Sequence, residues 1–244
     1  REFLKVNPAA TVPVLLHNAH PVYESHEQLN YVASVVDQTG LLVPQDAQLR
    51  QVMDAWVHKT SLLGDDPIDS PEATAGNAVP GLTVPIFAAM LASIPTAKIV
   101  EGLLFHRIKK RALFFLLMKR RGLQKTLALK PVAGVLNRSA KAMTAHLHEL
   151  ELQLESSGGP WICGDQFTLA DVGMMVIFDR LREGDWLHTL VHHRPVLDAY
   201  WTALQQRPSY QAGCADFTHP AVAEATAELA ALKQADQWPS GIPR

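Results

Sequence analysis

The spacing of apolar residues beyond residue 45 restricts the fold of this chain more than any other feature. Apolar side chains recur there at i, i+3, i+4 and i+7, which is the spacing of one face of an α-helix. The pattern predicts helices over residues 46–63, 82–94, 96–121, 131–156, 168–182, 189–206 and 220–234. The alternation of apolar and polar residues that is typical of a strand is missing from this part of the sequence. We therefore expect residues 46–244 to form an all-helical domain.

One segment of this region, "GDDPIDSPEATAGNAVPG" (64–81), lacks the helical pattern. It is rich in Pro, Gly and Asp, the residue types that favour turns. The composition predicts an exposed loop between two helices.

The first 38 residues follow a different pattern. Two short β-type runs, "TVPVLL" (11–16) and "PVY" (21–23), lie on either side of the turn-prone "HNAH". From Ser25 to about Asp37 the apolar residues return to helical spacing. The sequence thus predicts a small α/β portion, residues 1–38, in front of the all-helical domain.

Charge and cysteine content narrow the class of protein. A net charge of −2 gives no electrostatic basis for binding nucleic acid. Two cysteines without a C-x-x-C pair argue against a disulfide framework and fit a reducing compartment. The chain opens on the charged "REFLK" with no apolar segment typical of a signal peptide, and the most apolar stretch, 82–95, is too short to span a bilayer. We predict a cytoplasmic protein.

The sequence does not support a metal site or a catalytic nucleophile. His146 and His148 would face different sides of a helix, and no H-E-x-x-H pattern occurs, so we expect no metal site. Cys163 lies in the apolar "WICG" and is predicted to be a core residue rather than a nucleophile. No G-x-S-x-G, P-loop or G-x-G-x-x-G supports acyl transfer, nucleotide hydrolysis or dinucleotide binding.

Two dipeptides are candidates for binding a small ligand. A proline cannot donate to a strand ladder, so Pro13 belongs at an edge, at a strand start or in a cis bond, which would turn the backbone of Val12 toward a bound peptide. Ser25 stands where a helix N-cap is expected, and the free N–H groups of a helix start attract anions. Glu24 beside it could pair with an ammonium. Taken singly, each dipeptide also fits a structural role, as a strand-start proline or as a plain cap with a solvated acid.

Taken together, these residues resemble the glutathione-binding half of the thioredoxin-like domain in glutathione transferases. The matching residues are Asn7-Pro8, Val12-Pro13-Val14-Leu15, Glu24-Ser25 and Tyr31. The resemblance implies that the backbone of Val12 binds the cysteinyl part of glutathione beside a cis Pro13. It also implies that Glu24 and Ser25 hold the γ-glutamyl end. Thr11 stands where many members of the family carry Gln or Lys.

A second match lies in the helical region. "GDQFTLADV" (164–172) is similar to the family's helix-capping signature, with Thr168 at the N-cap and Asp171 at N3 in a variant of the capping box. "QQRPSYQAG" (205–213) is similar to the end of a later helix of the same domain. The resemblance implies a partial thioredoxin-like domain over residues 1–38 and the family's all-helical C-terminal domain over residues 46–244. The Ser, Cys or Tyr that activates the thiol in this family would lie upstream of residue 1, so the catalytic residue stays unidentified.

The resemblance implies a glutathione transferase that acts as a homodimer, with glutathione as co-substrate and a small electrophile as the second substrate. A non-catalytic binding or scaffold protein of the same fold is the alternative. A membrane-associated relative is a third hypothesis, because residues 107–125 hold eight Lys or Arg around an apolar core. The basic residues form two separate clumps, which favours an ordinary helix with a packed apolar face and a solvated basic face.

Overall fold

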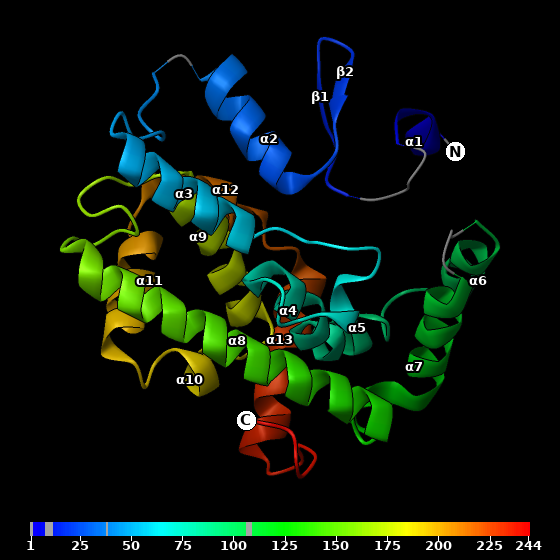
Figure 1. Cartoon of the computed structure of the whole chain (residues 1–244). Helices are drawn as coiled ribbons and strands as arrows, with labels where there is room; N and C mark the ends of the chain where they lie inside the picture. The colour runs from blue at the N-terminus through cyan, green and yellow to red at the C-terminus, as the bar shows by residue number, and fades with distance from the viewer. Residues whose placement is uncertain (1, 8–11, 38, 106–108) are drawn as a thin grey trace.

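The computed structural model describes residues 2–7, 12–37, 39–105 and 109–244. The chain is mostly helical, with one two-stranded sheet near the N-terminus. Figure 1 shows this sheet and helix α2 at one end of the molecule, and the remaining long helices gathered into a bundle beneath them. The predicted combination of a small α/β portion with a larger all-helical portion is confirmed.

The N-terminal portion is built around a β-hairpin. A short helix, α1 (Glu2–Val6), precedes the antiparallel strands β1 (Leu15–His17) and β2 (His20–Val22). The turn residues Asn18 and Ala19 have φ angles of 51° and 63°, the left-handed geometry of the tight turns that match the twist of a hairpin. Helix α2 (Ser25–Tyr31) follows and ends in a π-helical turn, Val32–Val36. Thr11 and Pro8 lie outside the described residues.

The helical portion agrees with the predicted helices at most positions. Its helices are α3 (Ala47–Lys59), α4 (Ala75–Leu82), α5 (Val84–Met90), α6 (Thr96–Phe105), α7 (Lys109–Leu127), α8 (Lys130–Ser157), α9 (Leu169–Glu183), α10 (Leu187–Leu190), α11 (Pro195–Gln205), α12 (Pro208–Gly213) and α13 (Pro220–Gln234), with 3-10 turns at Pro67–Asp69 and Ala215–Phe217. The described part of this region contains no strand beyond two isolated bridges.

The prediction of an exposed loop over residues 64–81 is wrong in its second half. Residues from Ala75 onward form helix α4, and Ala75, Asn77 and Ala78 are almost completely buried. Small side chains permit this, because a Cβ at Gly81 would overlap the Ser139 hydroxyl of α8. Gly81, one of the glycines that suggested a loop, is therefore a residue that lets α4 pack tightly on α8.

Two predicted helices are divided in the structure. The predicted helix 96–121 corresponds to α6 and α7, and residues 106–108 between them lie outside the described residues. Helix α7 continues to Leu127 through Gly122, whose φ of 72° interrupts the regular helix. The predicted helix 189–206 consists of α10 and α11, because Pro195 occupies the first position of a new helix.

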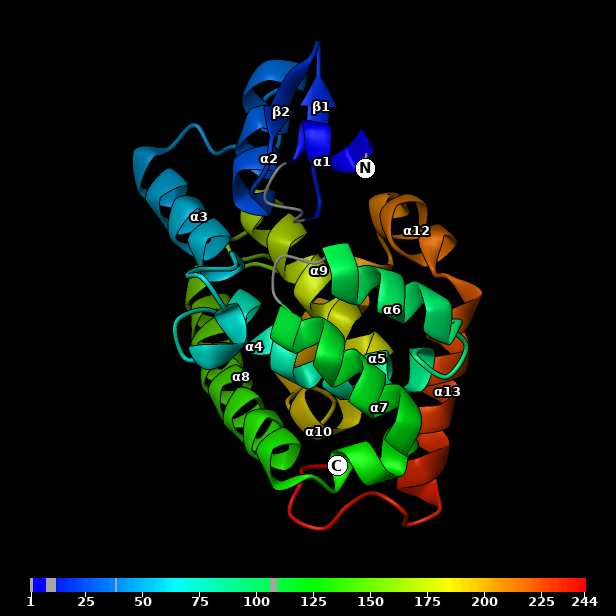
Figure 2. The same ribbon diagram turned by 90° about the vertical axis from the view of Figure 1, so that its right-hand side faces the viewer.

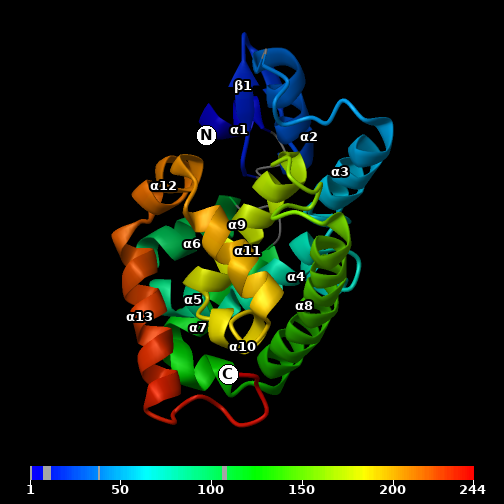
Figure 3. The same ribbon diagram turned by 90° about the vertical axis from the view of Figure 1, so that its left-hand side faces the viewer.

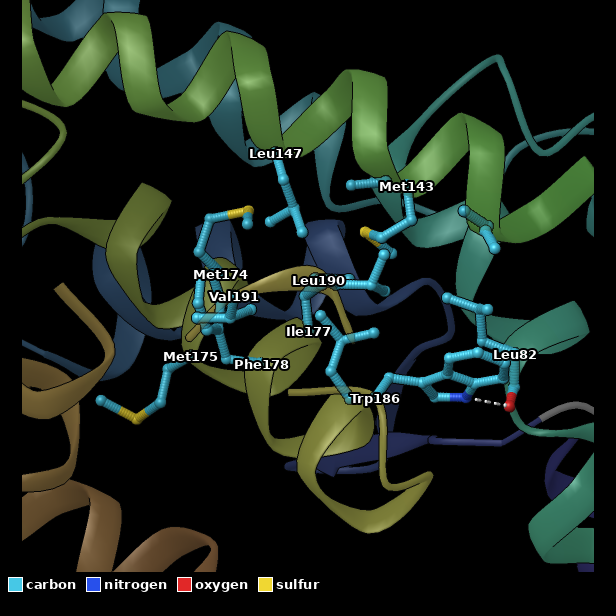
Figure 4. Close-up of a cluster of buried hydrophobic side chains, with 14 of the residues drawn as sticks. Leu82, Met143, Leu147, Met174, Met175, Ile177, Phe178, Trp186, Leu190 and Val191 are labelled. Atoms are coloured by element: carbon cyan, nitrogen blue, oxygen red, sulfur yellow. Dashed lines mark hydrogen bonds between the residues drawn. The ribbon is translucent and has the colours of Figure 1, made fainter. Parts of the chain in front are cut away.

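The hydrophobic core centres on α9. Figures 2 and 3 show α8 and α13 along opposite flanks of the helical portion, with α9 between them. Figure 4 shows side chains from several helices meeting there, among them Leu147 of α8, Phe178 of α9 and Trp186. All three are fully buried, and the Trp186 indole N–H donates to the Leu82 carbonyl at 2.8 Å. This bond fixes α4 against the end of α9.

None of the described helices combines the length and the apolar character that crossing a bilayer would require.

Candidate functional site

The hairpin brings the two candidate dipeptides to the same place. Its strands pair Leu15 with Val22 and His17 with His20. Pro13 and Glu24 each lie two residues beyond the last pair of this ladder, and Val12 and Ser25 each lie three residues beyond it, all at the open end of the hairpin. Figures 1 and 2 show the hairpin turn pointing away from the helical bundle and the open end pointing toward it. Residues that are separated in sequence thus share one end of the sheet.

The Val12-Pro13 peptide bond is cis, as predicted. The side chain of Val12 is 76% exposed, and Pro13 is exposed as well. The described part of the chain leaves both residues largely open to solvent.

The predicted N-cap is wrong by one residue. Glu24 has the extended backbone of an N-cap (φ −81°, ψ 138°), and its carbonyl accepts the first helical hydrogen bond, from the Gln28 N–H at 2.8 Å. Ser25 is therefore the first residue inside α2. Apolar spacing locates a helix start only to within one or two residues, which explains the error.

This shift leaves both side chains available to a ligand. The Glu24 carboxylate makes no capping hydrogen bond, and the Ser25 hydroxyl has no partner among the described residues. Both residues are exposed. Ser25 also contributes one of the backbone N–H groups that a helix start leaves without an intrahelical acceptor. The arrangement offers an acceptor for an ammonium next to donors for a carboxylate.

A side chain that the sequence analysis did not identify holds this end together. The Gln28 amide nitrogen donates to three carbonyl oxygens, those of Pro13 (3.1 Å), Val22 (2.9 Å) and Tyr23 (3.0 Å). On the other side of the hairpin, the Tyr31 hydroxyl lies 3.0 Å from His17 Nδ1. Helix α2 is therefore bound to both strands through polar side chains.

An open groove of about 460 Å³ lies between β2 and α2. It includes Glu24 together with residues of one face of α2, but neither Val12 nor Ser25. The lining residues are His20, Pro21, Val22, Tyr23, Glu24, Glu27, Asn30, Tyr31 and Ser34. The Glu24 carboxylate thus borders both the open end of the hairpin and this groove.

The predicted helix cap is present in α9. Thr168 is the N-cap, and its N–H donates to the carboxylate of Asp171, the N3 residue, at 2.8 Å. The same carboxylate accepts from the Ile162 N–H at 3.1 Å and from the Tyr200 hydroxyl at 2.9 Å. Burial raises the pKa of Asp171, and the hydrogen bonds that it accepts oppose this shift. All of its partners are structural, so the prediction of a structural role agrees with the geometry.

The residues that were considered as metal ligands or nucleophiles are occupied otherwise. The described residues contain no group of three or more His, Cys, Asp or Glu side chains arranged to hold a metal ion. His146 is buried, with Nε2 3.1 Å from the Pro71 carbonyl, and His148 Nδ1 lies 3.8 Å from Glu151 Oε2. Cys163 is 3% exposed, and burial raises the pKa of its thiol. The prediction that Cys163 is a core residue is confirmed.

The basic segment 107–125 packs on the bundle where the structure describes its side chains. Met118 and Leu123 of α7 are buried. Lys119 Nζ donates to the carbonyls of Leu91 (3.0 Å) and Ala92 (3.1 Å). Residues 107 and 108 and the side chains as far as residue 112 lie outside the described part. The contacts beyond it are those of an ordinary packed helix.

In sequence, this chain is similar to proteins of one family. Residues 137–212 match the family model of the glutathione S-transferase C-terminal domain. The chain is 24% identical to glutathione S-transferase TCHQD of Arabidopsis thaliana over 213 residues, which are 86% of this chain and 72% of that protein.

Solved structures of the same family share the fold. Glutathione transferase F7 of Populus trichocarpa superposes with a TM-score of 0.55 at 17% identity, covering 92% of this chain and 79% of that one. The apo form of glutathione S-transferase III also gives a TM-score of 0.55, at 23% identity, with 89% and 78% covered. Isozyme E7 of Drosophila melanogaster gives 0.50 at 19% identity, with 95% and 78% covered.

Proposed function

Because residues 137–212 match the glutathione S-transferase C-terminal domain and the chain is similar to a glutathione S-transferase over 213 residues, we propose that it binds glutathione and presents the thiolate to an electrophilic substrate. The observation that carries this proposal is the open end of the hairpin. There the backbone of Val12, the Glu24 carboxylate and the first turn of α2 lie at the same end of the sheet. The Glu24 carboxylate and the Ser25 hydroxyl have no competing hydrogen-bond partner among the described residues.

The chemistry of glutathione fits these groups. Its γ-glutamyl end carries an ammonium and a carboxylate. Glu24 would pair with the ammonium, and the hydroxyl and N–H of Ser25 would donate to the carboxylate, which the positive end of the helix also favours. The N–H and C=O of Val12 would bind the cysteinyl backbone, so that the cysteine lies beside Pro13.

The bound thiol would react as the thiolate, which is the nucleophilic form of cysteine. Its sulfur would attack the electrophilic carbon of the second substrate, form the C–S bond and expel the leaving group. The residues of this site hold glutathione in place, and the group that lowers the thiol pKa is not assigned. The cytoplasmic location, predicted from the cysteine content and the absence of a signal-type segment, and the homodimer, which the family resemblance implies, remain predictions.

A non-catalytic glutathione-binding protein is the second candidate. Such a protein would keep the contacts of Glu24, Ser25 and Val12 and lack the acceleration of thiol transfer. The presence of all these groups at one end of the hairpin supports binding in either case, so the two candidates differ in turnover alone.

An assay of thiol transfer distinguishes these candidates. The protein is mixed with glutathione and an activated aryl halide, and formation of the thioether is followed by absorbance. A transferase gives a rate that is proportional to protein concentration and saturates with glutathione. The Cys214→Ser variant is the control, because Cys214 is the less buried of the two protein thiols and its own arylation must not be mistaken for turnover. The assay uses the full reading frame, because no residue within 1–244 is assigned as the group that activates the thiol. Binding of glutathione by that protein with no acceleration above the uncatalysed rate would support the non-catalytic alternative.

A further inference from the structure

Gln28 makes an unusual set of hydrogen bonds. Its Nε2 atom lies 3.1 Å from the Pro13 oxygen, 2.9 Å from the Val22 oxygen and 3.0 Å from the Tyr23 oxygen. All three neighbours are carbonyls, which only accept, so the nitrogen of the amide must face them. An amide NH₂ has two hydrogens, and one of these is therefore shared between two acceptors.

The three carbonyls belong to both chain segments that form the candidate site. Pro13 directly follows Val12, and Tyr23 directly precedes Glu24. Proline has no N–H, so Pro13 cannot continue the hairpin ladder toward the open end. The amide of Gln28 supplies the missing donors at this point. It does so from α2, one helical turn after Glu24, whose carbonyl accepts from the Gln28 N–H.

We infer that Gln28 is a positioning residue for the glutathione site. Its amide fixes the distance between the backbone of Val12 and the start of α2 at Glu24 and Ser25. One glutathione molecule can then contact both. The inference rests on the proposed function, and it adds a residue that touches no ligand atom. Gln28 acts through the carbonyls of Pro13, Val22 and Tyr23, which lie on the protein side of the site.

Two substitutions test the role of the amide. Gln28→Met keeps the length of the side chain and removes both donors. Gln28→Glu keeps the shape and places an acceptor against three carbonyls, which repel it. Gln48→Met is the matched control, because Gln48 is an exposed glutamine of α3, a helix outside the candidate site. Each protein is titrated with glutathione by calorimetry, and its melting temperature and kcat at saturating glutathione are measured.

We expect Gln28→Met to raise the Kd for glutathione on the order of tenfold, the effect of losing one to two neutral hydrogen bonds. Gln28→Glu should raise it further, and Gln48→Met should leave it unchanged. The kcat at saturating glutathione should change little, because the amide acts on binding of the ground state and the transition state alike. A merely structural role would reduce the number of binding sites per mole of protein and leave the Kd of the folded fraction unchanged.

Each contrary result has a distinct meaning. A Kd in both Gln28 variants equal to that of the wild type would overturn the positioning role and leave the proposed function intact. Complete unfolding of both variants would also overturn it, since Gln28 would then support the whole fold. Absence of glutathione binding by the wild type would overturn the proposed function and this inference together.

Discussion

At the scale of single residues, His146 couples folding to pH. Burial lowers the pKa of its imidazole, and the positive charge of Lys59 lowers it further. The hydrogen bond to the Pro71 carbonyl and the negative charge of Glu72 act in the opposite direction. The Nδ1 atom is buried without a partner, which agrees with a neutral ring that donates from Nε2. The folded state disfavours the protonated ring. The contribution of His146 to the free energy of unfolding is therefore complete above the ordinary pKa of 6.5 and is lost as the pH falls through and below that value.

The expected result is a loss of unfolding free energy between about pH 8 and about pH 5 that is smaller in His146→Gln than in the wild type. Gln keeps an N–H that can reach the Pro71 carbonyl and has no proton to gain in this range. Urea unfolding at each pH measures the difference. His188→Gln is the control, because His188 is exposed on the neighbouring α10. The same pH dependence in His146→Gln and the wild type would contradict this account.

The residues of the candidate site could be predicted from the sequence to different degrees. The sequence identifies four of them, Val12, Pro13, Glu24 and Ser25. Their residue types carry the binding chemistry, and they follow one another in a recognisable order. Gln28 does not stand out, since a glutamine one turn inside a helix is ordinary by composition. Only the three carbonyl distances reveal its role, and these depend on the folded hairpin, which brings Pro13 and Tyr23 within reach of one side chain.

At the scale of elements, helix α9 depends on its cap. The Asp171 carboxylate is fully buried and accepts hydrogen bonds from Ile162, Thr168 and Tyr200. Asp171→Ala leaves these donors buried and unpaired, at about 1–3 kcal/mol each, so we expect a loss on the order of 3 kcal/mol or more. Urea unfolding measures it, with the exposed Asp165→Ala as the control. The affinity of the folded protein for glutathione should not change, because the groups proposed to bind it, on Val12, Glu24 and Ser25, do not belong to α9. A tenfold loss of affinity at an unchanged melting temperature would overturn the structural assignment.

Helix α9 was predictable and helix α4 was not, for physical reasons. The cap signature of α9 is local, with Thr168 and Asp171 three residues apart, and the apolar spacing that follows is regular. Helix α4 contains Gly76, Pro80 and Gly81, residue types that favour a loop by composition. It forms because Asn77 bonds the backbone of Leu63 and Ser70 and because Gly81 lets α8 approach. These contacts join segments that are distant in sequence, and no local pattern reports them.

At the scale of the whole molecule, the small α/β portion carries the candidate binding groups and the helical portion supplies most of the buried core. The order of the two portions and most helix bounds followed from apolar spacing alone. The division of the chain at residues 38 and 46 remains a prediction. The meeting of the two dipeptides at one end of the hairpin required the strand register, which is set by the tight turn at Asn18 and Ala19.

The central claim is that Ser25 and Glu24 bind the γ-glutamyl end of glutathione, and isothermal titration calorimetry of glutathione into the wild type and Ser25→Ala tests it most directly. Loss of a hydrogen bond to a charged carboxylate is worth about 1.5–3 kcal/mol, so Ser25→Ala should bind roughly 10- to 150-fold more weakly. Ser156→Ala is the control, because Ser156 is exposed on α8, outside the candidate site, and its hydroxyl bonds the Gln153 carbonyl of the same helix. Equal affinity of Ser25→Ala and the wild type, or no binding of glutathione by either, would contradict the account.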